Sequence, residues 1–396
     1  MSMISRSYRR IMLFTWMLLL LPVCWSPPVH ADGGAPNLAY VSGTAQGISV
    51  IDTGAARITK TISLGDDPHT ILLSQDGRLL YVTLPGRGQV VVIAAKTGRT
   101  ICTAHLPGTP TLLALDQESN TLYAGGNGAT GVSAIDPETC KIEHTFQIES
   151  AVNGLAVTAP EIGTPHTSKN QLWVAGTDAL NVFDDRTGQL LGRISVPGGP
   201  QYISFPPGTT VYVTTRQGGV DAVNFQTRKV SQLLTGGTFG PMDYDALTGE
   251  VYVPDQKHSE LAVLSPIDPS MTILPKEPVR VIPTGVPPET VAITNDGLLG
   301  FVALQNGEVK MIDLLGRRFA YTVNVGGNPH FIITGLYPPT TDLTPTPTPS
   351  QQKPFWSTLP AWAIPASILV YLLVFFTLVW FFLRMLRRTL RERHHR

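Results

Sequence analysis

A pattern that recurs seven times between Leu38 and Tyr337 constrains this chain more than any other feature. Each copy is marked by an aromatic residue that small or β-branched residues follow, as in LAYVSG, LLYVTL and TVYVTT. The markers are Tyr40, Tyr81, Tyr123, Trp173, Tyr212, Tyr252 and Phe301. They lie 39 to 50 residues apart, so one supersecondary unit repeats along the chain.

Each repeat contains the signals of four short strands. The aromatic strand is followed by a second strand, as in ISVIDT, and by a more polar third strand such as KTISLG. A Gly/Pro break and a short apolar strand complete the unit. Four short strands in about forty residues are typical of a propeller blade. We therefore predict an all-β, seven-bladed β-propeller with four-stranded blades over residues 32–337.

Acidic residues at strand ends are interpreted as turn residues. Asp76-Gly77 and Asp296-Gly297 are tight-hairpin signals between an apolar strand and the aromatic strand that follows it. Asp52, Asp136 and Asp313 end the second strand of their repeats, and we expect their side chains to cap the next turn.

The phase of the repeat predicts how the ring closes. No apolar strand precedes the first aromatic strand, and the last apolar strand, Phe331 to Thr334, has no aromatic strand after it. Pairing that strand with the N-terminal blade would remove two open sheet edges. Both termini would then lie on one face, together with the long insertions 158–170 and 265–278. These insertions form either a docking surface or tolerated loop growth.

The two ends of the chain predict export and membrane anchoring. Residues 1–31 resemble a signal peptide, with three Arg, an apolar run and Val29-His30-Ala31 before the cleavage point; lipid anchoring at Cys24 is the rival. Residues 338–355 form a Thr/Pro-rich stalk. Residues 356–383 are predicted to be a transmembrane helix, and residues 384–396 a cytoplasmic tail. Its topology-setting cluster contains Arg384, Arg387, Arg388 and Arg391.

The charge distribution excludes one class of partner. Setting aside the three Arg of the first ten residues, and the six Arg and one Glu of the last thirteen, leaves 20 basic and 28 acidic residues. The remaining net charge of −8 repels phosphate backbones, so nucleic acid is not expected as a partner. We expect a propeller displayed outside the cell membrane, where an oxidising compartment permits, but does not require, a disulfide between Cys102 and Cys140.

The motifs resemble those of the YVTN family of β-propellers. The resemblance rests on Tyr-Val-Thr in LLYVTL and TVYVTT, Ile-Asp after the second strand, and the Gly-x-x-Pro of Gly65–Pro68 and Gly285–Pro288. It covers about 300 residues and implies a seven-bladed propeller that is often secreted or surface-attached. Related propellers include binding modules, lactonases and haem-carrying redox domains, so the resemblance implies no single activity.

One residue from each repeat is expected at the entrance of the central channel, at the start of the innermost strand. These residues are His69, Thr111, Asn153, Gln201, Met242, Glu289 and His330. Among them, His69, Glu289 and His330 come from successive blades and form a candidate site for a divalent metal. The competing interpretation is that these polar side chains only hydrate the channel.

No hydrolase, metalloprotease or phosphate-binding motif occurs in the sequence. We therefore expect a binding or scaffold propeller whose ligand is a protein, a glycan or a small molecule. The alternative is a metal-dependent enzyme, lactonase-like or redox, with its site at the channel mouth.

Overall fold

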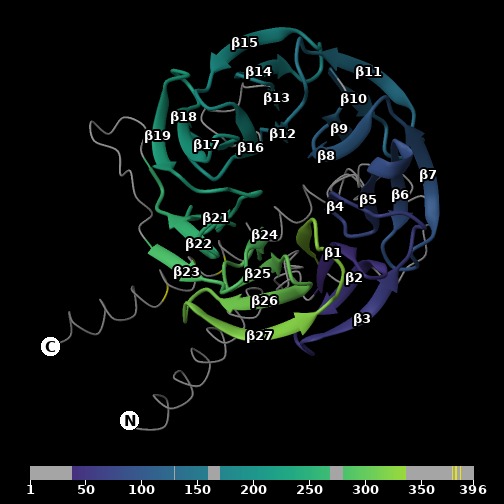
Figure 1. Cartoon of the computed structure of the whole chain (residues 1–396), viewed down its shortest axis with the longest axis vertical. Helices are drawn as coiled ribbons and strands as arrows, with labels where there is room; N and C mark the ends of the chain where they lie inside the picture. Colours follow the sequence, from purple (N-terminus) through teal and green to yellow (C-terminus); the bar gives the residue numbers. More distant parts are fainter. Residues whose placement is uncertain are drawn as a thin grey trace, which may run out of the picture. The chain divides into compact units, whose positions relative to one another are not determined.

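The computed structural model describes residues 38–128, 130–158, 170–267 and 280–335, and single residues Thr377, Trp380 and Arg384. The chain divides into two compact units, Met1–Pro339 and Thr340–Arg396. All described strands belong to the first unit, where they form seven sheets of four antiparallel strands. Figure 1 shows these sheets arranged around a central axis as the blades of a propeller.

The blades are numbered in chain order, and the strands of each blade are given from the channel outward. Blades 1 to 4 contain β28 (Ile332–Gly335), β1 (Leu38–Thr44), β2 (Gly47–Asp52) and β3 (Arg57–Ile62); β4 (Ile71–Leu73), β5 (Leu79–Leu84), β6 (Gln89–Ala94) and β7 (Thr100–His105); β8 (Thr109–Asp116), β9 (Thr121–Asn127), β10 (Gly131–Ile135) and β11 (Ile142–Gln147); and β12 (Gly154–Val157), β13 (Gln171–Ala175), β14 (Ala179–Asp184) and β15 (Leu190–Ser195). Blades 5 to 7 contain β16 (Pro200–Ser204), β17 (Thr210–Thr215), β18 (Gly219–Asn224) and β19 (Val230–Thr235); β20 (Asp243–Tyr244), β21 (Val251–Asp255), β22 (Glu260–Leu264) and β23 (Arg280–Pro283); and β24 (Pro288–Ile293), β25 (Leu299–Leu304), β26 (Glu308–Asp313) and β27 (Arg318–Asn324). A short 3₁₀ turn, η2 (Pro85–Arg87), joins β5 to β6.

Blade 1 is closed by the two ends of the repeat array, as the phase of the repeat predicts. The last strand, β28, pairs antiparallel with the first, β1, from Leu38↔Gly335 to Val41↔Ile332. In Figure 1 the yellow-green β28 lies beside the purple β1. The strand begins one residue later than expected. Closure pairs the inner edge of β1, which would otherwise be open, and couples the termini of the array.

The marker aromatics explain why the repeat folds into blades. All seven are buried, with exposed fractions of 3% or less, because the second strand of a blade presents them to a neighbouring blade. Tyr40, for example, packs with Ile71, Leu80 and Val82 of blade 2. The core therefore consists of apolar layers between blades, and burial of each large ring contributes about 2–3 kcal/mol.

The predicted turn residues have the expected geometry. Gly77 and Gly297 have φ angles of 70° and 63°, in the left-handed region that favours glycine. Asp52 Oδ1 accepts a hydrogen bond from Ala55 N at 2.8 Å. Asp136 Oδ1 and Asp313 Oδ1 accept from Glu138 N and Gly316 N at 2.9 Å. The acids at the ends of β2, β10 and β26, the third strands of their blades from the channel outward, are confirmed as caps.

Cys102 of β7 and Cys140, which follows β10, form a disulfide between blades 2 and 3. The sequence alone left this pairing open, because two cysteines 38 residues apart do not define a framework. The bond joins the outer part of blade 2 to the turn after β10 of blade 3.

Several predicted segments lie outside the described residues. They are the signal peptide, the stalk and most of the two insertions, of which 159–169 and 268–279 are not described. In the second unit Thr377, Trp380 and Arg384 are helical, and the Arg384 guanidinium lies 4.8 Å from the centre of the Trp380 ring. Within the described part of the chain, no helix has the length and apolarity needed to cross a membrane. The predicted helix 356–383 remains a prediction.

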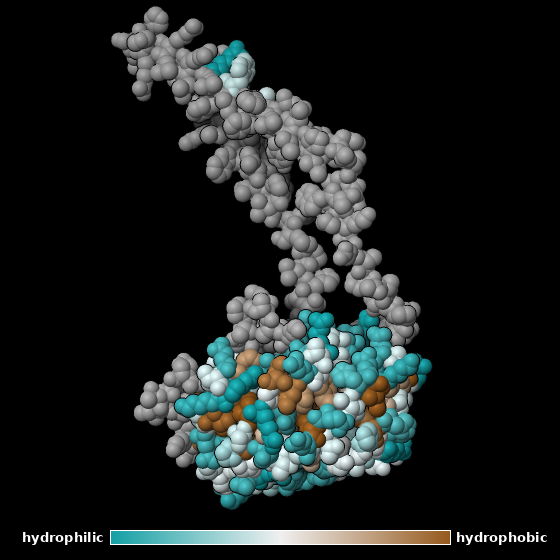
Figure 2. Space-filling view, turned by 90° about the horizontal axis from the view of Figure 1, so that it is seen from above, coloured by the Kyte–Doolittle hydropathy of each residue, from teal (hydrophilic) through white to brown (hydrophobic). Residues whose placement is uncertain are grey.

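The described surface of the first unit is mainly hydrophilic. Figure 2 shows a view in which hydrophobic patches are small and are separated by polar residues. Single apolar side chains on outer strands, such as Ile101, Ile142 and Leu190, are exposed. The side of the propeller drawn in Figure 2 therefore shows no large continuous apolar patch.

Candidate functional site

The seven residues predicted for the channel mouth occupy equivalent places. Each lies just before, or at the start of, the innermost strand of its blade, on the face opposite the turns that follow those strands. Backbone hydrogen bonds to the second strand of the same blade hold three of these residues in place. His69 N donates to Thr83 O at 3.0 Å, Asn153 N to Ala175 O at 2.8 Å, and His330 N to Ser42 O at 3.0 Å.

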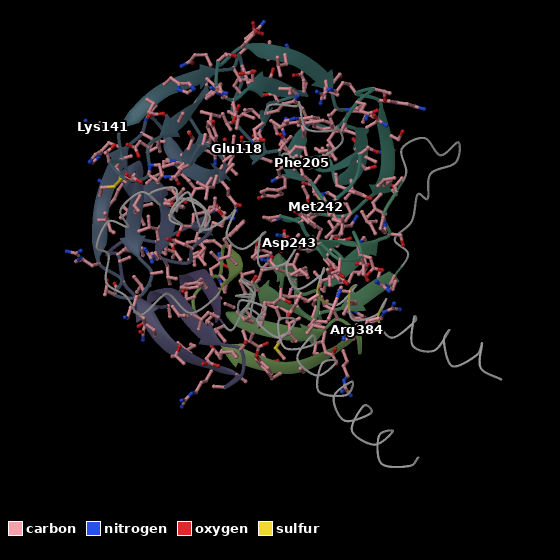
Figure 3. All side chains as sticks on the ribbon, turned by 180° about the vertical axis from the view of Figure 1, so that it is seen from behind. Glu118, Lys141, Phe205, Met242, Asp243 and Arg384 are labelled. Carbon is pink, nitrogen blue, oxygen red and sulfur yellow. A yellow bond between two sulfur atoms is a disulfide. The ribbon has the colours of Figure 1, made fainter. Side chains whose placement is uncertain are left out.

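Five of the seven line one cavity of about 160 Å³. They are His69, Thr111, Met242, Glu289 and His330. Figure 3 shows Met242 close to the middle of the ring, next to Asp243. The polar members come from blades 1, 2, 3 and 7, so the cavity is assembled by the closed ring and not by any one blade.

The remaining two predicted residues have other surroundings. The Asn153 amide donates to Gly176 O at 2.8 Å, within its own blade. Gln201 lines a separate cavity of about 230 Å³, together with Arg216, Phe239 and Gln256. The next residue, Tyr202, contributes to the walls of both cavities.

The two histidines are stacked on each other across the junction of blades 1 and 2. Their ring centroids are 4.9 Å apart, with an interplanar angle of 17°. His330 Nε2 lies 2.9 Å from Asp67 Oδ2, and His69 Nδ1 lies 3.2 Å from Thr70 Oγ1. Burial, assisted by the neighbouring His330, lowers the pKa of His69 to about 4. His69 is therefore uncharged at neutral pH.

Glu289 is held by two amides from neighbouring turns. Gln256 Nε2, on the β21–β22 turn, donates to Glu289 Oε2 at 2.9 Å, and Gln305 Nε2, on the β25–β26 turn, donates to Oε1. These bonds fix the carboxylate at the cavity wall. Each of its oxygens keeps a lone pair for a ligand.

The structure does not group Glu289 with the two histidines as a metal site requires. Among the described residues, Asp255, His258 and Glu260 are the one set of at least three potential ligands whose atoms all lie within 4.8 Å of one another. Two histidines face each other at the mouth, but Glu289 is turned to Gln256 and Gln305. Cross-blade amide bonds direct the carboxylate in this structure, and the metal site expected from His69, Glu289 and His330 stays a prediction.

An apolar wall, which the sequence did not single out, completes the cavity. It is formed by Leu112, Leu155, Ile203, Pro241 and Phe331, with Tyr202 beside them. Asp67, Gln256 and Gln305 were also missed. Asp67 could have been found in the Asp-Asp-Pro-His run, but the two glutamines carry no sequence signal beyond their place in a turn.

The mouth therefore offers one fixed carboxylate, two stacked imidazoles and an apolar wall. Such a site can hold a small group that has an apolar body and a hydrogen-bonding, positively charged end. It can also position the His330–Asp67 pair against a polar substrate.

Comparison with known proteins shows the fold and no more. No family model and no curated protein matches the chain. Among solved structures, a protein of unknown function from Desulfotomaculum acetoxidans is 15% identical, with a TM-score of 0.61 over 76% of this chain and 99% of that one. A candidate 6-phosphogluconolactonase from Bacteroides uniformis is 15% identical, with a TM-score of 0.60 over 75% and 99%. The dihydro-heme d1 dehydrogenase NirN is 14% identical, with a TM-score of 0.55 over 78% of each chain.

These comparisons define the class as a seven-bladed β-propeller. Identities this low carry no activity from those proteins to this chain. The resemblance to the YVTN family remains a prediction from the motifs.

Proposed function

We propose that this chain is a membrane-anchored, extracytoplasmic binding propeller whose channel mouth holds a cationic group on an apolar stem. The observation that carries the proposal is the pairing of Glu289 with an apolar wall inside one small cavity. A lysine side chain of a partner protein, or a small primary amine, has this chemistry. The signal-like N-terminus, the Thr/Pro stalk and the apolar segment before the Arg cluster support the location.

The electrostatics of the cavity support a cationic ligand. Glu289 is the acidic side chain in its lining, and the cavity-lining His69 is uncharged because burial lowers its pKa. An ammonium group would form a charge-assisted hydrogen bond with a carboxylate that Gln256 and Gln305 already orient. Little side-chain entropy is then lost when the ligand binds.

The size of the cavity limits what enters. A volume of about 160 Å³ holds roughly five water molecules at ~30 Å³ each, so a single side chain or a short alkylamine fits. Met242 and Leu155 would contact the alkyl stem. A larger partner would lie over the mouth and insert one residue.

The test is calorimetric titration of the full-length chain in mild detergent with n-butylamine and, separately, butyrate. We expect the amine to bind and butyrate not to bind. Glu289→Gln should weaken amine binding about tenfold or more, since a charge-assisted bond is lost. Glu308→Gln, at a carboxylate outside the cavity lining, is the matched control and should leave binding unchanged. Equal binding of both probes would contradict the proposal.

One observation favours a second candidate, an enzyme that uses the same mouth. His330 Nε2 and Asp67 Oδ2 are 2.9 Å apart, an imidazole–carboxylate pair of the type that orients a general base. A hydrolase would open δ-valerolactone, with or without Mn²⁺, and would lose this activity in Asp67→Asn. A binding protein would show no turnover and would keep its amine affinity in that variant.

A further inference from the structure

A second polar group lies between blades 3 and 4, on the face opposite the channel mouth. Asp116 ends the innermost strand β8 of blade 3, Asn170 precedes β13, and Asp185 follows β14 of blade 4. All three are buried, with exposed fractions of 3%, 6% and 3%. Asn170 Nδ2 donates to Asp116 Oδ1 at 2.7 Å across the blade boundary, and the carboxyl group of Asp185 lies next to that of Asp116.

Asp185 is a carboxyl group at a position where the equivalent residues of three other blades are apolar. In blades 2, 4, 5 and 7 the residue after the third strand donates its backbone N–H to the same partner position before the second strand. That residue is Ala95, Asp185, Phe225 or Leu314, buried in every case. Blade 4 therefore places a carboxyl group where the corresponding blades place an apolar side chain.

A carboxyl group at the place of Asp116 is not unusual by itself. Asp245 of blade 6 occupies the same position and caps its turn through hydrogen bonds from Leu247 N and Thr248 Oγ1. At the boundary of blades 6 and 7, the residue equivalent to Asp185 is Leu314, which is apolar. Only between blades 3 and 4, among the described residues, does a second carboxyl group face the first.

Asp116 accepts hydrogen bonds from Glu118 N, from Ser119 N and Oγ, and from Asn170 Nδ2, but no described basic side chain offsets the charge of the pair. Among the described residues, no Arg, Lys or His forms an ion pair with Asp116 or Asp185. Asp185 Oδ1 and Asn170 Oδ1 are fully enclosed and have no hydrogen-bond partner. A bound cation would satisfy these two enclosed acceptors and offset the charge of the two carboxyl groups.

We propose that Asp116, Asp185 and Asn170 form an oxygen-lined site for Ca²⁺ that joins blades 3 and 4. Carboxylate and amide oxygens are the ligands that Ca²⁺ prefers, and its flexible coordination accepts an incomplete protein set completed by water. Asp116 is oriented by hydrogen bonds from Glu118 N at 3.0 Å and from Ser119 N at 3.3 Å. This site is independent of the channel mouth, and its role is to hold two adjacent blades together.

The test is the effect of Ca²⁺ on thermal unfolding of the full-length chain in mild detergent. A free Ca²⁺ concentration 100 times the dissociation constant should raise the melting temperature by roughly 5 °C, and a chelator should reverse the rise. Tb³⁺ in place of Ca²⁺ should give luminescence sensitised by Tyr123, whose hydroxyl lies 3.4 Å from Asp185 O.

The test variant combines Asp116→Ser with Asp185→Ala. Blade 2 has Ser74 at the position equivalent to Asp116 and Ala95 at the position equivalent to Asp185, so each replacement already occurs in this propeller and the variant is expected to fold. It should lose both the Ca²⁺ response and the Tb³⁺ signal. Asp76→Asn, on the corresponding turn of blade 2, is the control and should keep both.

Two results would overturn the proposal. A Ca²⁺ response that persists in the double variant would mean that the ion binds elsewhere. A wild-type melting temperature that millimolar Ca²⁺ does not change, but that rises on acidification, would mean that the Asp116–Asp185 pair shares a proton and does not bind a cation.

Discussion

Asp221 lies in the middle of β18 with an exposed fraction of 2%, and replacing it tests how the blades accommodate charge. Burial raises the pKa of this carboxyl group from 3.8 to about 6. The folded protein therefore binds the proton more tightly than the unfolded chain, and stability falls as pH rises between these two values. Above the folded pKa the cost is about 3 kcal/mol, and below pH 4 it is less than about 1 kcal/mol.

Asp221→Asn removes this charge and keeps the shape of the side chain. Blade 4 already has Asn181 at the equivalent place, since Asn181 pairs with Val174 as Asp221 pairs with Val213. We expect the variant to be more stable than the wild type at pH 8, by up to about 3 kcal/mol, with the gain disappearing towards pH 4.

The assay is urea unfolding of the full-length chain in mild detergent, followed by tryptophan fluorescence at pH 4, 6 and 8. Ser49→Ala, at the same place in blade 1, is an uncharged control whose effect should not change with pH. An Asp221→Asn variant that loses the same stability at every pH would refute the reasoning. Such a result would mean that the carboxyl group contributes a hydrogen bond and not a buried charge.

Three further predictions concern the framework. Replacing Cys102 and Cys140 by Ser should lower the free energy of unfolding by about 4 kcal/mol, since the bond closes a loop of 38 residues; denaturant titration with and without reductant checks this. Trp173→Ala should cost about 3–5 kcal/mol, because the ring is fully buried and the Arg228 guanidinium lies 4.7 Å from its centre; Arg228→Met should cost less. Replacing Ile332 and Ile333 of β28 by Pro should abolish pairing with β1, lower the melting temperature and promote aggregation visible by light scattering; proline at Thr346 of the predicted stalk should have no effect.

The ring could be predicted from the sequence because its determinants are local and repeated. Each aromatic strand carries its own marker, and the missing first strand implied closure by the last. The boundary of β28 differed by one residue, since the chain keeps pairing to Gly335 after the apolar run has ended. Turn caps such as Asp52 followed from their position alone.

The candidate site was predictable only in position. Repeat alignment places one residue per blade near the mouth, and five of the seven line a common cavity. Side-chain direction depends on partners from other blades, which the alignment does not contain. Glu289, for example, is directed by Gln256 and Gln305, which belong to turns of two different blades.

The unusual polar contacts could not be read from one repeat at a time. Asp185 looks like an ordinary strand-end acid in the run Asp184-Asp185. Its contact with Asp116 becomes visible only when blades 3 and 4 are seen packed together. Blades 2, 5 and 7 have apolar side chains at the position of Asp185. The disulfide is a similar case, because Cys102 and Cys140 belong to different repeats.

The most direct test of the binding proposal is an NMR titration of the full-length chain in detergent micelles, with ¹³C-labelled methionine methyl groups. Met242 lines the cavity, and Met242→Leu assigns its signal. The account predicts that n-butylamine shifts the Met242 methyl resonance, that butyrate does not, and that Glu289→Gln abolishes the shift. An unshifted Met242 signal at saturating amine, or an equal shift with butyrate, would contradict it.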